Sequence, residues 1–154
     1  MKHIIWDFNG TLLNDTQLSL DVDNNVFEKL GIPCITLDDY RNNMTMPVRD
    51  FYPAVGVDYS VHSYETIARL WLDEFNQKAV GVGLVSGALD AIRFFHGQGR
   101  SQSVLSASYE PSLRKQCEAL GLTPYMADIS GLEDESASNK TEIGRRQLRE
   151  LGLE

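Results

Sequence analysis

The sequence contains little of what several large classes of protein require. Its two cysteines, Cys34 and Cys117, lie far apart and form no CxxC pair, which argues against a disulfide framework and a zinc ribbon. No stretch approaches the roughly 20 apolar residues that span a bilayer, and the N-terminal segment has no signal-peptide pattern. We therefore expect a soluble protein of the reducing cytoplasm that has no membrane partner.

Positive charge is also scarce. The chain has 14 Lys and Arg residues against 22 Asp and Glu residues, so its formal net charge is −8 at pH 7. Proteins that bind nucleic acids draw affinity from clustered basic residues that neutralise phosphates. We therefore expect no nucleic-acid partner, whereas a small phosphorylated metabolite needs only a few local donors and remains compatible with this charge.

The chain is long enough, at 154 residues, for one sizeable core and a small inserted subdomain. Residues 3–8 are apolar and β-branched and predict a buried strand, and residues 103–106 and 125–129 are the next strand-like segments. Helical periodicity and capping residues predict helices over 17–30, 37–44, 48–54, 60–78, 86–95, 111–120 and 139–151.

The order of these segments predicts the fold class and the domains. Strands that alternate with helices form a parallel sheet with helices on its faces, whereas residues 16–84 contain only helical segments. We therefore predict an α/β core made of residues 1–15 and 85–154, with residues 16–84 inserted as a small all-helical domain.

Three polar residues are placed where such a sheet binds ligands. Asp7 ends the first predicted strand, Ser106 ends the second, and Lys140 begins the last helix. Ligands of parallel α/β sheets gather at the carboxyl ends of the strands and at helix N-termini. A carboxylate can attack phosphorus while hydroxyl and ammonium groups hold the other phosphate oxygens. The set predicts phosphoryl transfer.

Three segments resemble, in the same order along the chain, the motifs of the haloacid dehalogenase (HAD) superfamily. IIWDFNGTL resembles the first motif, DxDGT after a hydrophobic strand, VLSAS resembles the second, and SNKTEIG is similar to the third. The helical block resembles the cap of the phosphoglycolate-phosphatase-like branch. The resemblance covers the whole chain and implies a HAD-like, Rossmannoid sheet with a cap that closes over the site.

The resemblance also implies a role for each matching residue. Asp7 would be the nucleophile and a Mg²⁺ ligand, and Asn9 would offer its backbone carbonyl to the same ion. Ser106 and Lys140 would bind the phosphoryl group, and Lys140 would pair with Asp7 as well. The other substrate-binding positions would be Gly10, Thr11 and Ala107.

Asn9 departs from the family pattern. Family phosphatases commonly carry a second Asp here, which protonates the leaving group and then activates water. An amide cannot exchange a proton near neutral pH, and general acid–base catalysis is worth about 10² to 10⁴ in rate.

The C-terminal residues are a second departure. The chain stops at Leu151–Glu154, before the strand and acidic pair of the fourth motif, and Asp134 and Glu135 precede Lys140 and do not form that motif. In the family this strand lies beside the first strand. Its absence would leave residues 3–8 at an edge of the sheet, where an apolar strand favours self-association.

These observations support three functions in decreasing order. The first is a Mg²⁺-dependent phosphatase of small phosphorylated metabolites that acts through an aspartyl phosphate on Asp7. The second, favoured by Asn9 and the absent fourth motif, is a catalytically weak or inactive phosphate-binding or interaction protein. The third is a 2-haloacid dehalogenase, which also uses an Asp nucleophile but normally needs no metal.

Overall fold

The computed structural model describes residues 2–133 and 140–153. The chain divides into two compact units, an α/β unit of residues 1–14 and 83–154 and a helical unit of residues 15–82. The domain boundaries predicted from the sequence, after residues 15 and 84, lie one residue and two residues further along the chain. No helix in the described part of the chain is both long and apolar enough to cross a membrane.

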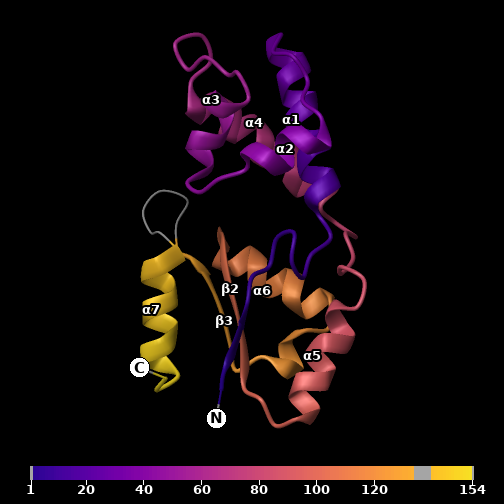
Figure 1. The fold of residues 1–154 in the computed structure, drawn as a ribbon, viewed down its shortest axis with the longest axis vertical. Coiled ribbons are helices and arrows are strands. Elements are labelled where there is room, and N and C mark those ends of the chain that lie inside the picture. The colour runs from indigo at the N-terminus through magenta and orange to yellow at the C-terminus, as the bar shows by residue number, and fades with distance from the viewer. Residues whose placement is uncertain (1, 134–139, 154) are drawn as a thin grey trace. The chain divides into compact units, whose positions relative to one another are not determined.

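The α/β unit is built on a sheet of three parallel strands in the order β1–β2–β3 (Figure 1). The strands are β1 (Ile4–Trp6), β2 (Gln102–Tyr109) and β3 (Asp128–Leu132). Trp6 aligns with Val104, and Val104 aligns with Ile129 on the next strand. The parallel α/β class predicted from the sequence is confirmed.

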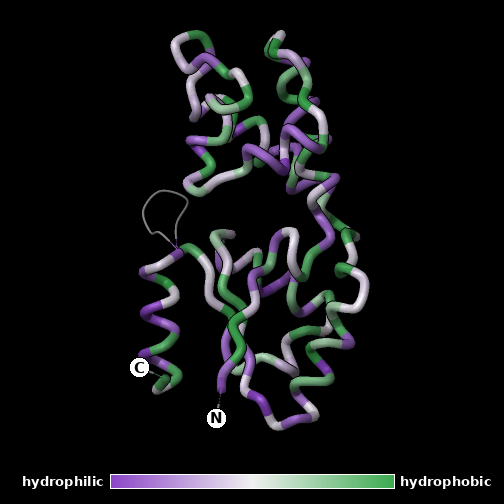
Figure 2. Tube along the Cα trace, viewed as in Figure 1, coloured by the Kyte–Doolittle hydropathy of each residue, from purple (hydrophilic) through white to green (hydrophobic). Residues whose placement is uncertain are grey.

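Three helices flank this sheet: α5 (Ala88–Gly97), α6 (Glu110–Ala119) and α7 (Lys140–Glu150), with a short 3-10 turn, η2 (Thr123–Tyr125), before β3. Helices α6 and α7 both contact β2 and β3, and α7 lies on the opposite side of the sheet from α5 (Figure 1). In Figure 2 the sheet is hydrophobic at its centre, whereas α7 alternates between hydrophilic and hydrophobic residues. Such alternation is typical of an amphipathic helix that covers a sheet.

The core of the α/β unit collects the apolar residues of the strands, of the loop after β1 and of the inner helix faces. Its fully or almost fully buried members are Phe8, Leu12, Leu13, Ile92, Val104, Leu113, Cys117, Leu122, Ile129 and Ile143. Burial of this apolar surface, at about 25 cal/mol per Å², stabilises the sheet that carries the polar residues described below.

The helical unit contains α1 (Thr16–Leu30), α2 (Leu37–Asn43), the 3-10 turn η1 (Val48–Asp50), α3 (Phe51–Ala54) and α4 (Tyr64–Lys78). Residues 15–82, all of which the structure describes, contain no strand. Helix α2 begins with a capping box, because the Thr36 side chain accepts from the Asp39 amide and Asp39 accepts from the Thr36 amide. The core of the unit consists of Val26, Phe27, Phe51, Tyr52, Val57 and Ile67.

Two helix starts in this unit differ from the sequence prediction. Helix α4 begins at Tyr64 with Ser63 as its N-cap, not at Ser60, because the Ser60 amide donates to the Asp58 carboxylate in a separate turn. Helix α1 begins at Thr16, one residue before the start predicted at residue 17 with Thr16 as its cap, and Asp15 occupies the N-cap position.

The boundaries of all three strands also differ from the prediction. Strand β1 covers Ile4–Trp6 and not residues 3–8, because Phe8 belongs to the turn that follows. Strand β2 continues past Ser106 to Tyr109, because Tyr109 still pairs with Leu132 of β3 after an irregularity in the register. Strand β3 begins at Asp128 and not at Tyr125, since Tyr125 belongs to η2. Ser106 therefore lies inside β2 and not at its end.

Candidate active site

The loop that follows β1 is a tight turn around one carbonyl group. The carbonyl oxygen of Phe8 accepts hydrogen bonds from the amides of Thr11, Leu12 and Leu13 at 2.9–3.2 Å. Gly10 adopts φ 70°, a left-handed conformation that favours glycine. Phe8, Leu12 and Leu13 are buried, with 0–1% exposure. These three apolar side chains anchor the loop, and its polar residues face outward as a result.

Asp7 is one of these outward-facing residues and contacts the start of α7. Lys140 Nζ donates to Asp7 Oδ1 at 2.5 Å, and Thr11 Oγ1 donates to Asp7 Oδ2 at 3.4 Å. The two charged side chains are 47% exposed for Asp7 and 39% exposed for Lys140, so a ligand can reach both. A cation at a helix N-terminus is unfavourable by itself, and the Asp7 carboxylate compensates for this charge.

Asn9 contacts β2 through two serine hydroxyls. Ser108 Oγ donates to Asn9 Oδ1 at 2.8 Å, and Ser106 Oγ lies 3.3 Å from the same oxygen. The two serines also contact each other, because their hydroxyls are 3.0 Å apart and the Ser108 amide donates to Ser106 Oγ at 3.1 Å. The irregular register between Leu105 and Tyr109 includes both serines.

The residues predicted from the sequence therefore form two contact groups at the carboxyl ends of β1 and β2. Lys140 joins Asp7, and Ser106 joins Asn9, two residues further along the same loop. Gly10 lies in that loop, and Ala107 is an exposed residue between the two serines. Asp134, Glu135 and Asn139 lie outside the described residues.

Ser108 is a contact residue that the sequence prediction missed. Its signal was present, because side chains two residues apart in a regular strand point to the same face, and Ser106 and Ser108 have this spacing. The spacing is consistent with a strand that continues beyond Ser106, the end predicted from the sequence.

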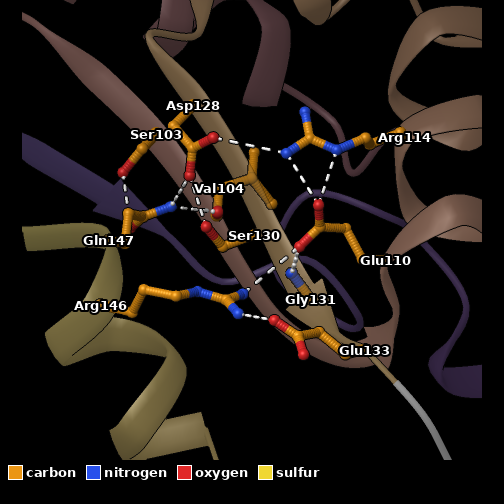
Figure 3. Close-up of polar contacts among 10 residues, drawn as sticks. All are labelled: Ser103, Val104, Glu110, Arg114, Asp128, Ser130, Gly131, Glu133, Arg146 and Gln147. Atoms are coloured by element: carbon orange, nitrogen blue, oxygen red, sulfur yellow. Dashed lines mark hydrogen bonds and ion pairs between the residues drawn. The ribbon is translucent and has the colours of Figure 1, made fainter. Parts of the chain in front are cut away.

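Helix α7, which carries Lys140, is fixed to the sheet by a buried glutamine (Figure 3). Gln147 has 0% exposure. It accepts from Ser103 Oγ at 3.0 Å and donates to the Val104 carbonyl and to Asp128 Oδ2, both at 2.9 Å. Gln147 follows Lys140 by seven residues, two helical turns, so both lie on nearly the same face of α7.

Asp128 is the acceptor at the centre of this network. Burial would raise the pKa of its carboxyl group, but hydrogen bonds from Ser130 and Gln147 outweigh burial and hold the pKa below its usual value. Arg114 of α6 also reaches Asp128, at 3.4 Å. Asp128 is therefore charged in the folded protein and links both helices to β3.

A second set of contacts surrounds Glu110, the first residue of α6 (Figure 3). Its carboxylate accepts from the Gly131 amide at 3.0 Å and from Arg114 Nε at 2.9 Å, and it lies 3.7 Å from Arg146 of α7. Arg146 also pairs with Glu133. Glu110 directly follows β2, so these contacts hold the strand that carries the two serines against β3 and α7.

The oxygen atoms at the carboxyl ends of the strands suit an oxygen-ligated metal ion. Among the described residues no group of three or more His, Cys, Asp or Glu side chains could hold a metal ion. Mg²⁺ needs fewer protein ligands than that, because it is commonly bound through one or two carboxylates while waters and phosphate oxygens complete its coordination shell. The exposed Asp7 carboxylate fits this chemistry.

The parallel sheet with helices on its faces and polar residues after its strands is an α/β fold with a Rossmann-like core. The chain belongs to the haloacid dehalogenase-like hydrolase family, whose sequence pattern matches residues 4–154. No protein of curated function matches the sequence.

Solved structures of other proteins with the same fold align with almost the whole chain. A haloacid dehalogenase-like hydrolase from Streptococcus pneumoniae has a TM-score of 0.80 at 15% identity, covering 99% of this chain and 71% of that one. A predicted phosphoglycolate phosphatase from Haemophilus somnus has a TM-score of 0.76 at 11% identity, covering 99% and 72%. A CbbY variant from Rhodobacter sphaeroides, in complex with xylulose-1,5-bisphosphate, has a TM-score of 0.72 at 22% identity, covering 99% and 73%. These identities establish the fold alone.

Proposed function

We propose that the protein is a Mg²⁺-dependent phosphatase of small phosphorylated metabolites that acts through an aspartyl phosphate on Asp7. The contact between Lys140 Nζ and Asp7 Oδ1 carries this proposal, because it joins two motifs that are 133 residues apart. A carboxylate beside an ammonium group, both open to a ligand, is suited to attack a phosphate whose charge needs neutralising.

The residues at the carboxyl ends of the strands and at the start of α7 would each have a role in this reaction. Asp7 would attack phosphorus with one carboxylate oxygen, and Lys140 would neutralise the charge on the phosphoryl oxygens. Thr11 and the hydroxyl of Ser106 would donate hydrogen bonds to those oxygens, next to Gly10 and Ala107. Asp7 and the backbone carbonyl of Asn9 would hold Mg²⁺, which supplies further positive charge to the phosphate when bound.

The names of the structural neighbours support the substrate class. One is described as a predicted phosphoglycolate phosphatase and another was solved with xylulose-1,5-bisphosphate. Both names refer to small phosphorylated metabolites. The free thiols Cys34 and Cys117 support a place in the reducing cytoplasm.

Asn9 favours a second candidate, a phosphate-binding protein with weak or no turnover. Its side chain provides hydrogen bonds but no exchangeable proton. Calorimetric titration with inorganic phosphate and Mg²⁺, together with a hydrolysis assay, separates the two. Binding of phosphate without hydrolysis supports the second candidate. A separate assay tests the third candidate, a dehalogenase, which would release chloride from a 2-haloacid without added metal.

The test of the phosphatase is hydrolysis of p-nitrophenyl phosphate with Mg²⁺. We expect Asp7→Asn to lower the rate by at least about 10³-fold, as removal of a nucleophile does. Asp90→Asn removes an exposed carboxylate from α5 and should leave the rate unchanged. Equal rates for Asp7→Asn and the unaltered protein would refute the assignment of Asp7, provided that circular dichroism shows both to be folded.

A further inference from the structure

Helix α7 carries Lys140, and the side of this helix that faces the sheet has little apolar surface. Its buried residues are Ile143, Gly144 and Gln147, and of these only Ile143 has an apolar side chain. The helix lies close to β2 at Gly144, because a Cβ atom there would be 3.0 Å from Leu105 Cδ2. Apolar contacts favour burial but have no direction. They therefore specify the rotation and the axial position of a helix less sharply than hydrogen bonds do.

Gln147 forms directional hydrogen bonds to two strands (Figure 3). Its Oε1 accepts from Ser103 Oγ of β2, and its Nε2 donates to the Val104 carbonyl and to Asp128 Oδ2 of β3. The reverse orientation of the amide would point its oxygen at two acceptors, the Val104 carbonyl and the Asp128 carboxylate, and is therefore excluded. Because Gln147 is fully buried, water does not replace these partners.

The acceptor on β3 is itself held in place. Asp128 is charged in the folded protein, and a hydrogen bond to a charged acceptor is stronger than one between neutral groups. The Asp128 carboxylate also accepts from the Ser130 hydroxyl and lies 3.4 Å from the Arg114 guanidinium of α6. The contact between Gln147 and Asp128 therefore joins α7 to a fixed point of the sheet.

The separation between Gln147 and Lys140 makes the site sensitive to this contact. At a rise of about 1.5 Å per residue, Lys140 lies about 10 Å along α7 from Gln147, so a tilt of about 10° around Gln147 would move Lys140 by about 2 Å. The hydrogen bond from Lys140 Nζ to Asp7 Oδ1 is 2.5 Å long. A movement of about 2 Å is enough to break such a bond.

We propose that Gln147 is a positioning residue: its hydrogen bonds to β2 and β3 set the place of Lys140 and thereby the affinity of the site for phosphate. The proposal rests on the proposed function, because it requires Lys140 to bind the phosphoryl group. It assigns to the interior of the α/β unit a determinant of phosphate affinity that does not touch the phosphate.

Calorimetric titration with inorganic phosphate in the presence of Mg²⁺ tests this role. Gln147→Met keeps the length of the side chain and removes its hydrogen bonds. We expect it to weaken phosphate binding by about 10-fold, the lower end of the effect of residues that orient metal ligands. The stoichiometry of the titration counts the folded sites, so partial unfolding would lower the stoichiometry, whereas a displaced Lys140 raises the Kd.

A double-mutant cycle with Lys140→Ala separates positioning from a general loss of stability. Lys140→Ala should weaken phosphate binding by at least about 10-fold, because it removes a charged hydrogen-bond donor. If Gln147 acts through Lys140, Gln147→Met should cost no further affinity in the Lys140→Ala background, to within about 2-fold. A role limited to folding would give the same loss in both backgrounds.

The matched control is Gln102→Met, which removes a second buried amide of the same unit. Gln102 is fully buried, accepts from Trp6 Nε1 at 2.9 Å and donates to the Ile92 carbonyl at 3.1 Å. These bonds lead to β1 and to α5, which lies on the opposite side of the sheet from α7 (Figure 1). Gln102→Met should lower the free energy of unfolding, and any loss of phosphate affinity should be equal in the two backgrounds.

Ser103→Ala is a milder variant for use if Gln147→Met does not fold, because it removes only one of the partners of Gln147. It should weaken phosphate binding in the same direction, and only when Lys140 is present. An unchanged phosphate affinity, or an equal loss in both backgrounds, would show the inference to be wrong while Lys140 still binds phosphate. If Lys140→Ala binds phosphate as tightly as the unaltered chain, or if the unaltered chain does not bind it, the proposed function itself fails.

Discussion

Asp23 is a carboxyl group in the interior of the helical unit. It is buried on α1, and the Tyr52 hydroxyl donates to its Oδ1 at 3.1 Å. Burial raises the pKa of Asp23 to about 7, and the hydrogen bond from Tyr52 lowers it only in part. Burial and the neighbouring Asp23 also raise the pKa of Tyr52. Asp23 is therefore protonated in the folded protein at mildly acidic pH.

This pKa makes the stability of the helical unit depend on pH. Between the unfolded value of 3.8 and the folded value of about 7, the folded state holds a proton that the unfolded state has released. The free energy of unfolding should therefore fall as pH rises through this range and then level off. Asp23→Asn should remove this slope and, at pH 8, raise the free energy of unfolding by up to about 4 kcal/mol, at about 1.4 kcal/mol per pKa unit.

Urea unfolding at pH 5 and pH 8 measures this effect. Asp21→Asn changes an exposed carboxylate on the same helix and should behave as the unaltered protein. The same loss of stability from pH 5 to pH 8 in Asp23→Asn and the unaltered protein would show that Asp23 does not cause it.

At the scale of elements, the junction of β2, α6 and β3 depends on a close approach of backbones at Gly131. A Cβ atom at this position would lie 2.5 Å from the Ser108 carbonyl oxygen and 2.8 Å from Glu110 Cα. Backbone atoms cannot move aside as a flexible side chain can. The absence of a side chain at Gly131 thus allows β3 to pack against the end of β2, where Ser108 contacts Asn9.

We expect Gly131→Ala to lower the free energy of unfolding by about 1–3 kcal/mol, as overpacking does, and to reduce phosphatase activity by displacing Ser108. Gly97→Ala is the matched control, because a Cβ there meets no atom within 4 Å and alanine favours the helix by up to about 1 kcal/mol. Denaturant unfolding and p-nitrophenyl phosphate hydrolysis measure the two effects. Equal stability of the two variants would contradict the proposed clash.

At the scale of the whole molecule, β1 has an open edge in the described sheet. It pairs only with β2, and Ile5 at its centre is 40% exposed. Exposed apolar edge strands favour pairing with another chain. We propose that copies of the protein associate through β1.

Size-exclusion chromatography with light scattering tests this association. The apparent mass should rise with protein concentration, and Ile5→Lys should shift it toward the monomer, because a charged edge opposes strand pairing. Val80→Lys, at a residue of the helical unit that is 85% exposed, is the control for added charge. A monomer at all concentrations for the unaltered chain would rule out association through β1.

Local patterns were sufficient to predict much of this molecule. The apolar run before Asp7 predicted β1, Thr36 as a cap predicted the start of α2, and the alternation of strands and helices predicted the parallel α/β class. Each depends on neighbours in the sequence, such as the hydrogen bonds of a capping box or the alternation of strands and helices. The family and the candidate nucleophile followed from the same local patterns.

Only the tertiary structure decided which of these residues meet. Ser108 joins Asn9 because β2 continues beyond Ser106 and still pairs with β3. Lys140 reaches Asp7 on a helix that Gln147 binds to β2 and β3. The partners in these contacts are distant in the sequence, so no local pattern indicates them. The pair of Lys140 with Asp7 was expected only from the family resemblance, and the contact of Ser108 with Asn9 was not expected at all. The sequence by itself determined the residue types available for chemistry, and the packing of α6, α7 and β3 determined their contacts.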